Sequence, residues 1–187
     1  MSLKHAILGF LSFKPFSGYE LKKAFDSSVQ HFWPANQSQI YRTLAELEGG
    51  GFVEKEVVER EERLDMKIYN ITETGRTELH QWLATPLPKR DEREPFLIQV
   101  YFSGQLSDKE ILYIFRNKLK ETEERLAVYE SVHQMIQNTP QRITDPRIVF
   151  FSVLTLEAGY VNNQSIATWL RSAIERIETK NYKIDIG

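Results

Sequence analysis

The polar residues of one short segment, residues 36 to 48, are spaced so that they could bind a flat, hydrogen-bonding surface. At 100° per residue, Ser38 and Arg42 fall on the same side of a helix, with Gln39 and Tyr41 flanking them. A guanidinium is a rigid fork of donors, whereas a carboxamide both donates and accepts. These side chains therefore suit paired hydrogen bonds to planar rings such as nucleobases.

The same segment carries the signals of a helix that packs on a core. Asn36 is a good N-cap with Gln39 three positions on, and Gly49, Gly50 and Gly51 favour a helix end and a sharp turn. The glycines follow a helix rather than precede one, so they are interpreted as a cap and not as a phosphate-binding loop. An apolar stripe lies opposite Arg42 and consists of Ile40, Leu44 and Leu47.

Two helices are predicted before this one. Apolar residues with helical spacing run from residue 3 to residue 11, and Pro15 stops the pattern. Ser17 followed by Glu20 has the form of a capping box, so a second helix should begin there.

A β-hairpin and a fourth helix are predicted after the glycines. The runs "FVEKEVV" and "MKIYNI" are rich in β-branched or aromatic residues, and the polar run "EREERLD" lies between them. Thr72 or Thr74 should then cap a helix that buries Leu79, Trp82 and Leu83.

Three helices followed by a hairpin with a charged tip form the order of a winged helix-turn-helix, whose third helix enters the DNA major groove. Arg42 would donate to guanine, Gln37 or Gln39 would pair with adenine, and Ser38 would meet a base or a phosphate. The start of the second helix and the wing would bind phosphates. The residues expected to contact DNA are Ser17, Lys22, Gln37, Ser38, Gln39, Tyr41, Arg42, Arg63 and Lys67.

Several of these residues could have a structural or solvent-exposed role instead of a contact with DNA. Considered alone, Arg42 would be a solvated surface charge, and only its place ahead of a wing favours DNA contact. Tyr41 is as well suited to the core as to a phosphate. Phe32 and Trp33, which precede the helix, suit packing better than base stacking.

A linker is expected near residue 88, because Pro86, Pro88 and Pro95 flank the charged run "KRDERE". The expected domains are a winged helix-turn-helix at residues 1–88 and a helical dimerisation and effector domain at 89–187.

The second half of the chain is predicted to be helical. A short one is expected near residues 94 to 103, a long one after the capping box of Ser107 and Glu110, and a last one from Asp145. The apolar seam of the long helix comprises Ile111, Phe115, Leu119, Thr122, Leu126, Tyr129, Val132 and Ile136.

The last helix opens with "RIVFFSVLTLEAGYV", which is apolar on nearly all faces, so a partner subunit should cover it. Trp169 could instead line a ligand cavity, although dimer packing is the favoured interpretation. The residues expected at the dimer interface are Phe115, Leu119, Leu126, Phe151, Leu154, Tyr160, Trp169, Leu170 and Ile174.

Several motifs in the correct order resemble one known family. "SGYELKKAF", "FWPANQSQIYRTLAELEGGGFV" and "KIYNITETGRTELHQWL" are similar to the PadR family of bacterial transcriptional regulators, and "EAGYVNNQSIATWLRSAI" resembles the closing helix of its subgroup with a long helical C-terminal domain. The resemblance implies a winged-helix domain, a helical dimerisation domain, repression of an operator, and release from DNA by a ligand or stress signal.

The wing departs from the usual basic character of the family. Between Glu54 and Asp65 it carries six acidic and three basic residues. Because carboxylates repel phosphates, the wing should contribute little, or only Arg63 and Lys67 should point towards DNA.

The composition and the missing motifs exclude several classes of function. The absence of cysteine excludes disulfides and thiolate chemistry, and the formal net charge of -2 excludes bulk basicity, so local Lys and Arg must carry any affinity for phosphate. The four histidines show no metal-ligand spacing, and no nucleophile elbow, phosphate loop or dinucleotide fingerprint is present. No run is long and apolar enough to span a bilayer. We therefore expect a cytoplasmic protein that is not an enzyme and has no cofactor or metal.

The sequence thus predicts a mainly α protein with a small β-hairpin. Its expected partners are double-stranded DNA, a second copy of itself and a small-molecule effector. A homodimer would bind a pseudo-palindromic operator as a repressor. The alternative is a winged-helix module that binds another protein through its acidic wing.

Overall fold

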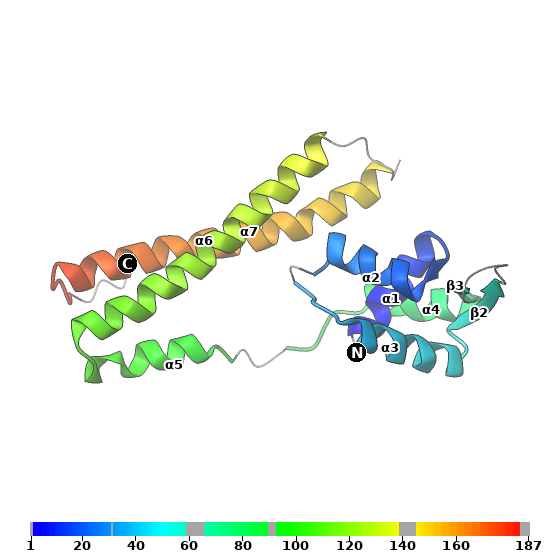
Figure 1. Ribbon diagram of the computed structural model, residues 1–187, viewed down its shortest axis with the longest axis horizontal. Helices are drawn as coiled ribbons and strands as arrows, with labels where there is room; N and C mark the ends of the chain where they lie inside the picture. Colours follow the sequence, from blue (N-terminus) through cyan, green and yellow to red (C-terminus); the bar gives the residue numbers. More distant parts are fainter. Residues whose placement is uncertain (1, 31, 59–65, 90–92, 139–144, 184–187) are drawn as a thin grey trace. The chain divides into compact units, whose positions relative to one another are not determined.

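The computed structural model describes residues 2–30, 32–58, 66–89, 93–138 and 145–183 (Figure 1). The chain divides into two compact units, Met1–Arg90 and Asp91–Gly187. The N-terminal unit combines short helices with a small sheet, and the described elements of the C-terminal unit are all helical. The prediction of a mainly α chain with a small β element is confirmed.

The N-terminal unit has the element order of a winged helix-turn-helix. Its elements are α1 (Ser2–Phe13), β1 (Phe16–Ser17), α2 (Gly18–Ser27), α3 (Gln37–Gly49), β2 (Val53–Val58), β3 (Met66–Ile71) and α4 (Glu73–Ala84). The predicted hairpin of β2 and β3 is confirmed. Sequence analysis missed β1, a two-residue strand that pairs antiparallel with β3 and gives the sheet the order β1-β3-β2.

The N-terminal core gathers the apolar stripes of the helices. Its fully buried side chains include Ile7, Leu8, Leu21, Phe25, Ile40 and Leu44. Leu79 is the member that α4 contributes to this core. Leu83, which was expected to be buried, is 67% exposed because it lies in the last turn of α4, beyond Leu79.

Helix starts follow the predicted capping chemistry. Ser17 and Glu20 form the capping box of α2, and Asn36 and Gln39 form that of α3. At the end of α3, Gly51 has φ 71, the left-handed conformation that glycine adopts without steric strain. The three glycines therefore end the helix and turn the chain into β2, as predicted.

The C-terminal unit is built on two long helices. It comprises α5 (Pro95–Phe102), a 3-10 turn (Ser103–Gln105), α6 (Asp108–Asn138) and α7 (Pro146–Glu178), and α6 packs along α7. Phe96 of α5, Phe115 of α6 and Trp169 of α7 form an aromatic cluster with ring centroids 5.6 to 6.3 Å apart.

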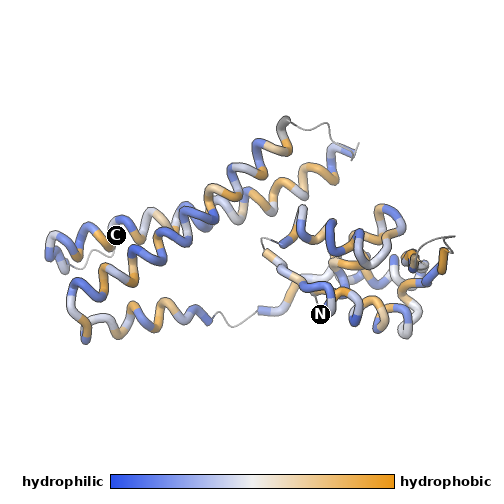
Figure 2. Tube along the Cα trace, viewed as in Figure 1, coloured by the Kyte–Doolittle hydropathy of each residue, from blue (hydrophilic) through white to orange (hydrophobic). Residues whose placement is uncertain are grey.

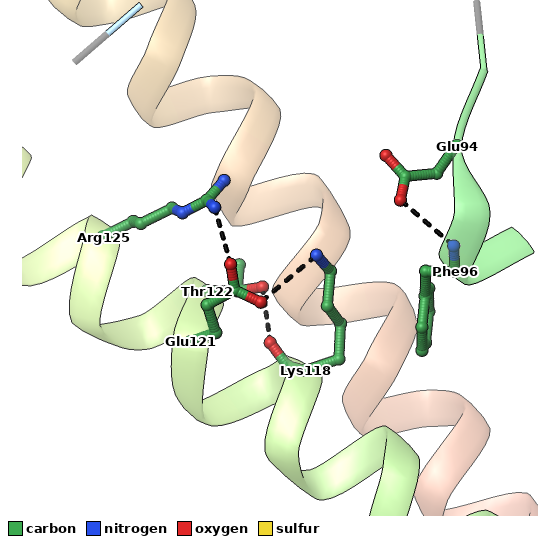
Figure 3. A network of polar contacts seen from close by, with 6 residues as sticks. All are labelled: Glu94, Phe96, Lys118, Glu121, Thr122 and Arg125. Carbon is green, nitrogen blue, oxygen red and sulfur yellow. Dashed lines mark hydrogen bonds and ion pairs between the residues drawn. The ribbon is translucent and has the colours of Figure 1, made fainter. Parts of the chain in front are cut away.

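Polar contacts support the helices around this cluster (Figure 3). Glu121 accepts hydrogen bonds from Lys118 at 3.3 Å and Arg125 at 2.6 Å, both on α6. The ammonium of Lys118 lies 5.7 Å from the centroid of the Phe96 ring, and Glu94 accepts from the Phe96 N–H at the start of α5. Of these contacts, the one between Lys118 and the Phe96 ring joins α6 to α5, while the others lie within α6 or cap the start of α5.

Candidate nucleic-acid interface

The outward side of α3 is open to solvent. Ser38, Arg42 and Ala45 are exposed, and the Arg42 side chain keeps 74% of its surface accessible. The opposite side is closed, since Ile40 and Leu44 are fully buried. The predicted helical faces are therefore the observed ones, and Arg42 can reach a ligand without any rearrangement of the core.

The two glutamines of α3 differ in what they can offer. The side-chain oxygen of Gln39 accepts from the Asn36 N–H at 2.9 Å, so its carbonyl is committed to the helix cap. Its NH₂ group can still donate. Gln37 occupies the first position of α3 and is exposed. Gln37 is therefore the better placed of the two for a bidentate contact with adenine.

Tyr41 lies at the junction of α3 and α2. It is 41% exposed, and its ring covers the backbone of Gly18 at the start of α2. One side of the ring therefore packs on α2 while the rest faces solvent. Contact of its hydroxyl with a phosphate stays a prediction.

Ser17 is withdrawn from this surface. It is 7% exposed, and its hydroxyl donates to Glu20 at 2.7 Å and accepts from the Glu20 N–H at 3.2 Å. The burial argues against the expected contact of the Ser17 side chain with DNA, because the cap occupies its hydroxyl.

Lys22 lies beside the start of α3. Its ammonium pairs with Asp26 one turn further along α2. A shallow depression joins α2 to α3 and brings Lys22 and Asp26 together with Asn36 and Gln39. Two residues expected to contact DNA, Lys22 and Gln39, therefore share one surface.

The wing is described only at its base. Lys67 on β3 is exposed, opposite Val57 of β2, whereas Arg63 lies outside the described residues, as do four of the six acidic positions. Glu54 and Glu56 are exposed on β2. The described part of the wing thus offers acidic side chains as well as Lys67.

Carboxylates accompany the cations around α3. Lys55 lies 2.7 Å from Glu48, and the hydrogen bond to Glu48 raises the pKa of Lys55 above its usual value. Arg42 Nε lies 3.9 Å from a carboxylate oxygen of Glu46. Sequence analysis missed Glu46 as a neighbour of Arg42, although the i,i+4 spacing on a helix signals such a pair.

The residues expected at a dimer interface fall into three groups by exposure. Phe115 and Leu170 are 4% and 0% exposed, so they belong to the interior between α6 and α7 and offer no surface to a partner. Leu119, Leu126, Tyr160 and Ile174 are half-buried. The exposed members are Phe151, Leu154 and Trp169.

A second apolar side of α7 faces away from α6. At 100° per residue this side lies roughly opposite the buried positions Leu156 and Leu170. Figure 2 shows the apolar character of the first half of α7, and the large exposed side chains there are Phe150, Phe151, Leu154 and Val161. The side is continuous over about three turns.

Helix α5 carries exposed apolar side chains that the sequence analysis did not assign to an interface. None of its residues is buried, and its exposed apolar side chains are Leu97, Ile98, Tyr101 and Phe102. Its length was predicted, but eight apolar-rich residues do not reveal by periodicity which side faces the protein. An exposed patch of this kind is typical of a protein-protein contact.

Among the described residues, no group of three His, Asp or Glu side chains is placed to hold a metal ion. Within that same part of the chain, no helix is both long and apolar enough to cross a membrane.

The N-terminal unit is thus a winged helix-turn-helix with an open third helix, and the chain continues into a long helix pair. Residues 7–81 match the model of the transcriptional regulator PadR-like family, and residues 92–178 match that of the virulence activator alpha C-term. A probable transcriptional regulator of Mycobacterium tuberculosis is 33% identical over 96% of this chain and 100% of its own. The chain belongs to the PadR-like family of transcriptional regulators.

Solved structures agree with this assignment. The negative transcriptional regulator PadR of Bacillus subtilis is 29% identical over 94% of this chain and 97% of its own. Its structure in complex with operator DNA has a TM-score of 0.81 and covers 95% of this chain and 99% of the other. Its structure in complex with p-coumaric acid has 28% identity, a TM-score of 0.77 and coverage of 94% and 95%.

Proposed function

We propose that this protein is a homodimeric transcriptional repressor that binds a pseudo-palindromic operator through α3 and is released by a small-molecule effector. The carrying observation is the exposed outward side of α3, with Ser38 and Arg42 free of the core and Gln37 at its start. Arg42 would donate two hydrogen bonds to a guanine, and Gln37 would pair with an adenine.

Dimerisation supplies the geometry of operator recognition. The second apolar side of α7 and the outer side of α5 would pair with the same surfaces of a second copy about a two-fold axis. Such a dimer presents two α3 helices about 34 Å apart, one turn of DNA, so the operator would have matching half-sites.

Phosphate contacts would fix the register on the duplex. Lys22, Tyr41 and Lys67 would donate to phosphates, as would Arg63 at the wing. The exposed Glu54 and Glu56 oppose a strong contribution from the wing.

Repression and its release follow from the relatives. The Bacillus subtilis relative is named as a negative regulator, and its complex with p-coumaric acid supports small aromatic acids as the first effectors to screen. An effector changes DNA affinity only if it binds one dimer geometry better than the other. The C-terminal unit would supply its contacts.

The remaining assignments follow from this role. We infer that the protein acts in the cytoplasm, without a catalytic reaction or a cofactor. A module that binds only proteins is not favoured, because the outward side of α3 is polar and the family is one of transcriptional regulators.

An electrophoretic mobility shift tests the proposal. The probes are the DNA upstream of the protein's own gene and a shuffled duplex of the same composition, at physiological salt. We expect the upstream probe to bind at least about 10³-fold more tightly. Equal affinity for the two probes would remove the claim of sequence specificity. Aromatic acids are then added to the bound complex to test for release.

A further inference from the structure

The cations around α3 are matched with carboxylates. Lys22 pairs with Asp26 on one flank, and Lys55 pairs with Glu48 on the other. On the outward side itself, Arg42 pairs with Glu46. Each unpaired cation on a DNA-binding surface adds affinity for phosphate. A carboxylate beside Arg42 should therefore weaken DNA binding unless it has another role.

Glu46 is placed on the side that would face DNA. Arg42 and Glu46 lie one turn apart at the i,i+4 spacing, and their side chains are 74% and 68% exposed. Arg42 is the single basic residue of α3, whereas Glu46 and Glu48 are both acidic. Nothing in the described core fixes Glu46, so its carboxylate is free to act on a ligand of Arg42.

A carboxylate at this position affects the two kinds of DNA contact differently. On unrelated DNA, Arg42 would contact a phosphate, and the negative charge of Glu46 would repel that same phosphate. At a guanine edge the acceptors are neutral, so the repulsion is small.

We propose that Glu46 is a specificity-determining residue, which holds the Arg42 guanidinium over the outward side of α3 and selects base contacts over phosphate contacts. This inference rests on the proposed function. It assigns Glu46 the role of lowering affinity for unrelated DNA rather than of raising affinity for the operator.

The test compares Glu46→Gln with wild type on two probes. One is a duplex that the wild-type protein selects from a random pool, and the other is a shuffled duplex of the same composition. The matched control is Glu124→Gln, since Glu124 also belongs to an exposed i,i+4 pair, 3.9 Å from Lys120 on α6, and the net charge changes equally. Circular dichroism and thermal unfolding confirm that the full-length variants fold.

We expect Glu46→Gln to bind the shuffled duplex about three- to tenfold more tightly and the selected duplex less than twofold more tightly. Glu124→Gln should change neither. In the Arg42→Ala background, Glu46→Gln should leave the ratio of the two affinities unchanged if Glu46 acts through Arg42.

The outcomes separate this inference from the proposed function. If wild type selects no duplex, the proposed function fails. If wild type binds a selected duplex but Glu46→Gln changes both affinities equally, only the role of Glu46 is overturned. An equal effect of Glu124→Gln on the ratio would likewise overturn it, because bulk charge would then suffice.

Discussion

The ring of Tyr41 on α3 lies against the backbone of Gly18 at the first position of α2. A Cβ atom added to Gly18 would lie 2.6 Å from Tyr41 Cζ, closer than van der Waals contact permits. Gly18 is buried, so the close approach fixes where the two helices of the helix-turn-helix meet. The glycine is needed here for space, and the position of α3 depends on it.

The first prediction concerns this contact. Gly18→Ala should displace Tyr41 and lower the free energy of unfolding by about 1 kcal/mol, because the half-exposed ring can move aside. Affinity for a selected duplex should fall roughly three- to tenfold as α3 and the hydroxyl shift. Urea unfolding and mobility shifts measure the two effects. If the cause is steric, adding Gly18→Ala to Tyr41→Ala should cost no further stability, whereas an unchanged Gly18→Ala single variant would contradict it.

Arg42→Ala tests whether the Arg42 side chain recognises a base pair. The change should weaken binding to the selected duplex by about 1 to 3 kcal/mol and relax the preference at one base pair. Stability should hardly change, because the side chain is 74% exposed. Arg76→Ala, an exposed arginine on α4, is the control. Retained discrimination between base pairs by Arg42→Ala would show that this side chain reads no base.

Helix faces and caps could be predicted because they depend on local chemistry. The exposure of Arg42 follows from the 3.6-residue period, and the cap of α3 follows from the spacing of Asn36 and Gln39. Burial of Leu83 was predicted wrongly, since periodicity does not show where the tertiary core ends along a helix.

Contacts between residues far apart in the sequence could not be predicted from it. The pairing of Phe16 with Tyr69 creates β1 from only two residues, too short a run for a periodic signal. The ring of Tyr41 on Gly18 joins two helices, and no spacing rule predicts such a meeting. Phe115 was assigned to a dimer interface because apolar seams within one chain and between chains have the same period.

The packing of α6 on α7 gives a stability prediction. A Cβ atom added to Gly159 would lie 2.6 Å from Tyr129 Cζ, and Tyr129 is 8% exposed. Gly159→Ala should therefore lower the free energy of unfolding by about 1 to 3 kcal/mol, measured by urea denaturation. Gly104→Ala is the matched control, because its Cβ would meet nothing within 4 Å. Equal stability of the two variants would show that α7 adjusts without strain.

A pH dependence is expected from Glu78 on α4. Hydrogen bonds from Lys4, and then from His5, lower the pKa of Glu78 below 4.5. A lowered folded-state pKa stabilises the fold above the unfolded pKa, and this contribution is lost as the pH falls through the folded value. Glu78→Gln should thus reduce stability at pH 7 by at most about 1 kcal/mol, with the difference from wild type shrinking below about pH 4.

Denaturation at several pH values measures this difference. Glu56→Gln, which neutralises an exposed carboxylate on β2, is the control and should track wild type throughout. A difference between Glu78→Gln and wild type that stays constant from pH 7 to pH 3 would exclude the ion pair as its source.

The unpartnered side of α7 gives the last prediction. Val161 is 53% exposed in the single chain, although it lies in a continuous apolar row with Phe150 and Leu154. If a second copy covers that row, Val161→Glu buries an unpaired carboxylate at the interface and should weaken dimerisation by several kcal/mol. Gln134→Glu adds the same charge at an exposed polar position of α6 and should leave the dimer intact. Light scattering after gel filtration distinguishes monomer from dimer.

Because half-sites one DNA turn apart need two joined α3 helices, the monomeric variant should also lose most of its affinity for the selected duplex while keeping the fold of each unit. A Val161→Glu protein that remains dimeric would place the interface on another surface, and the exposed side of α5 would be the next to test.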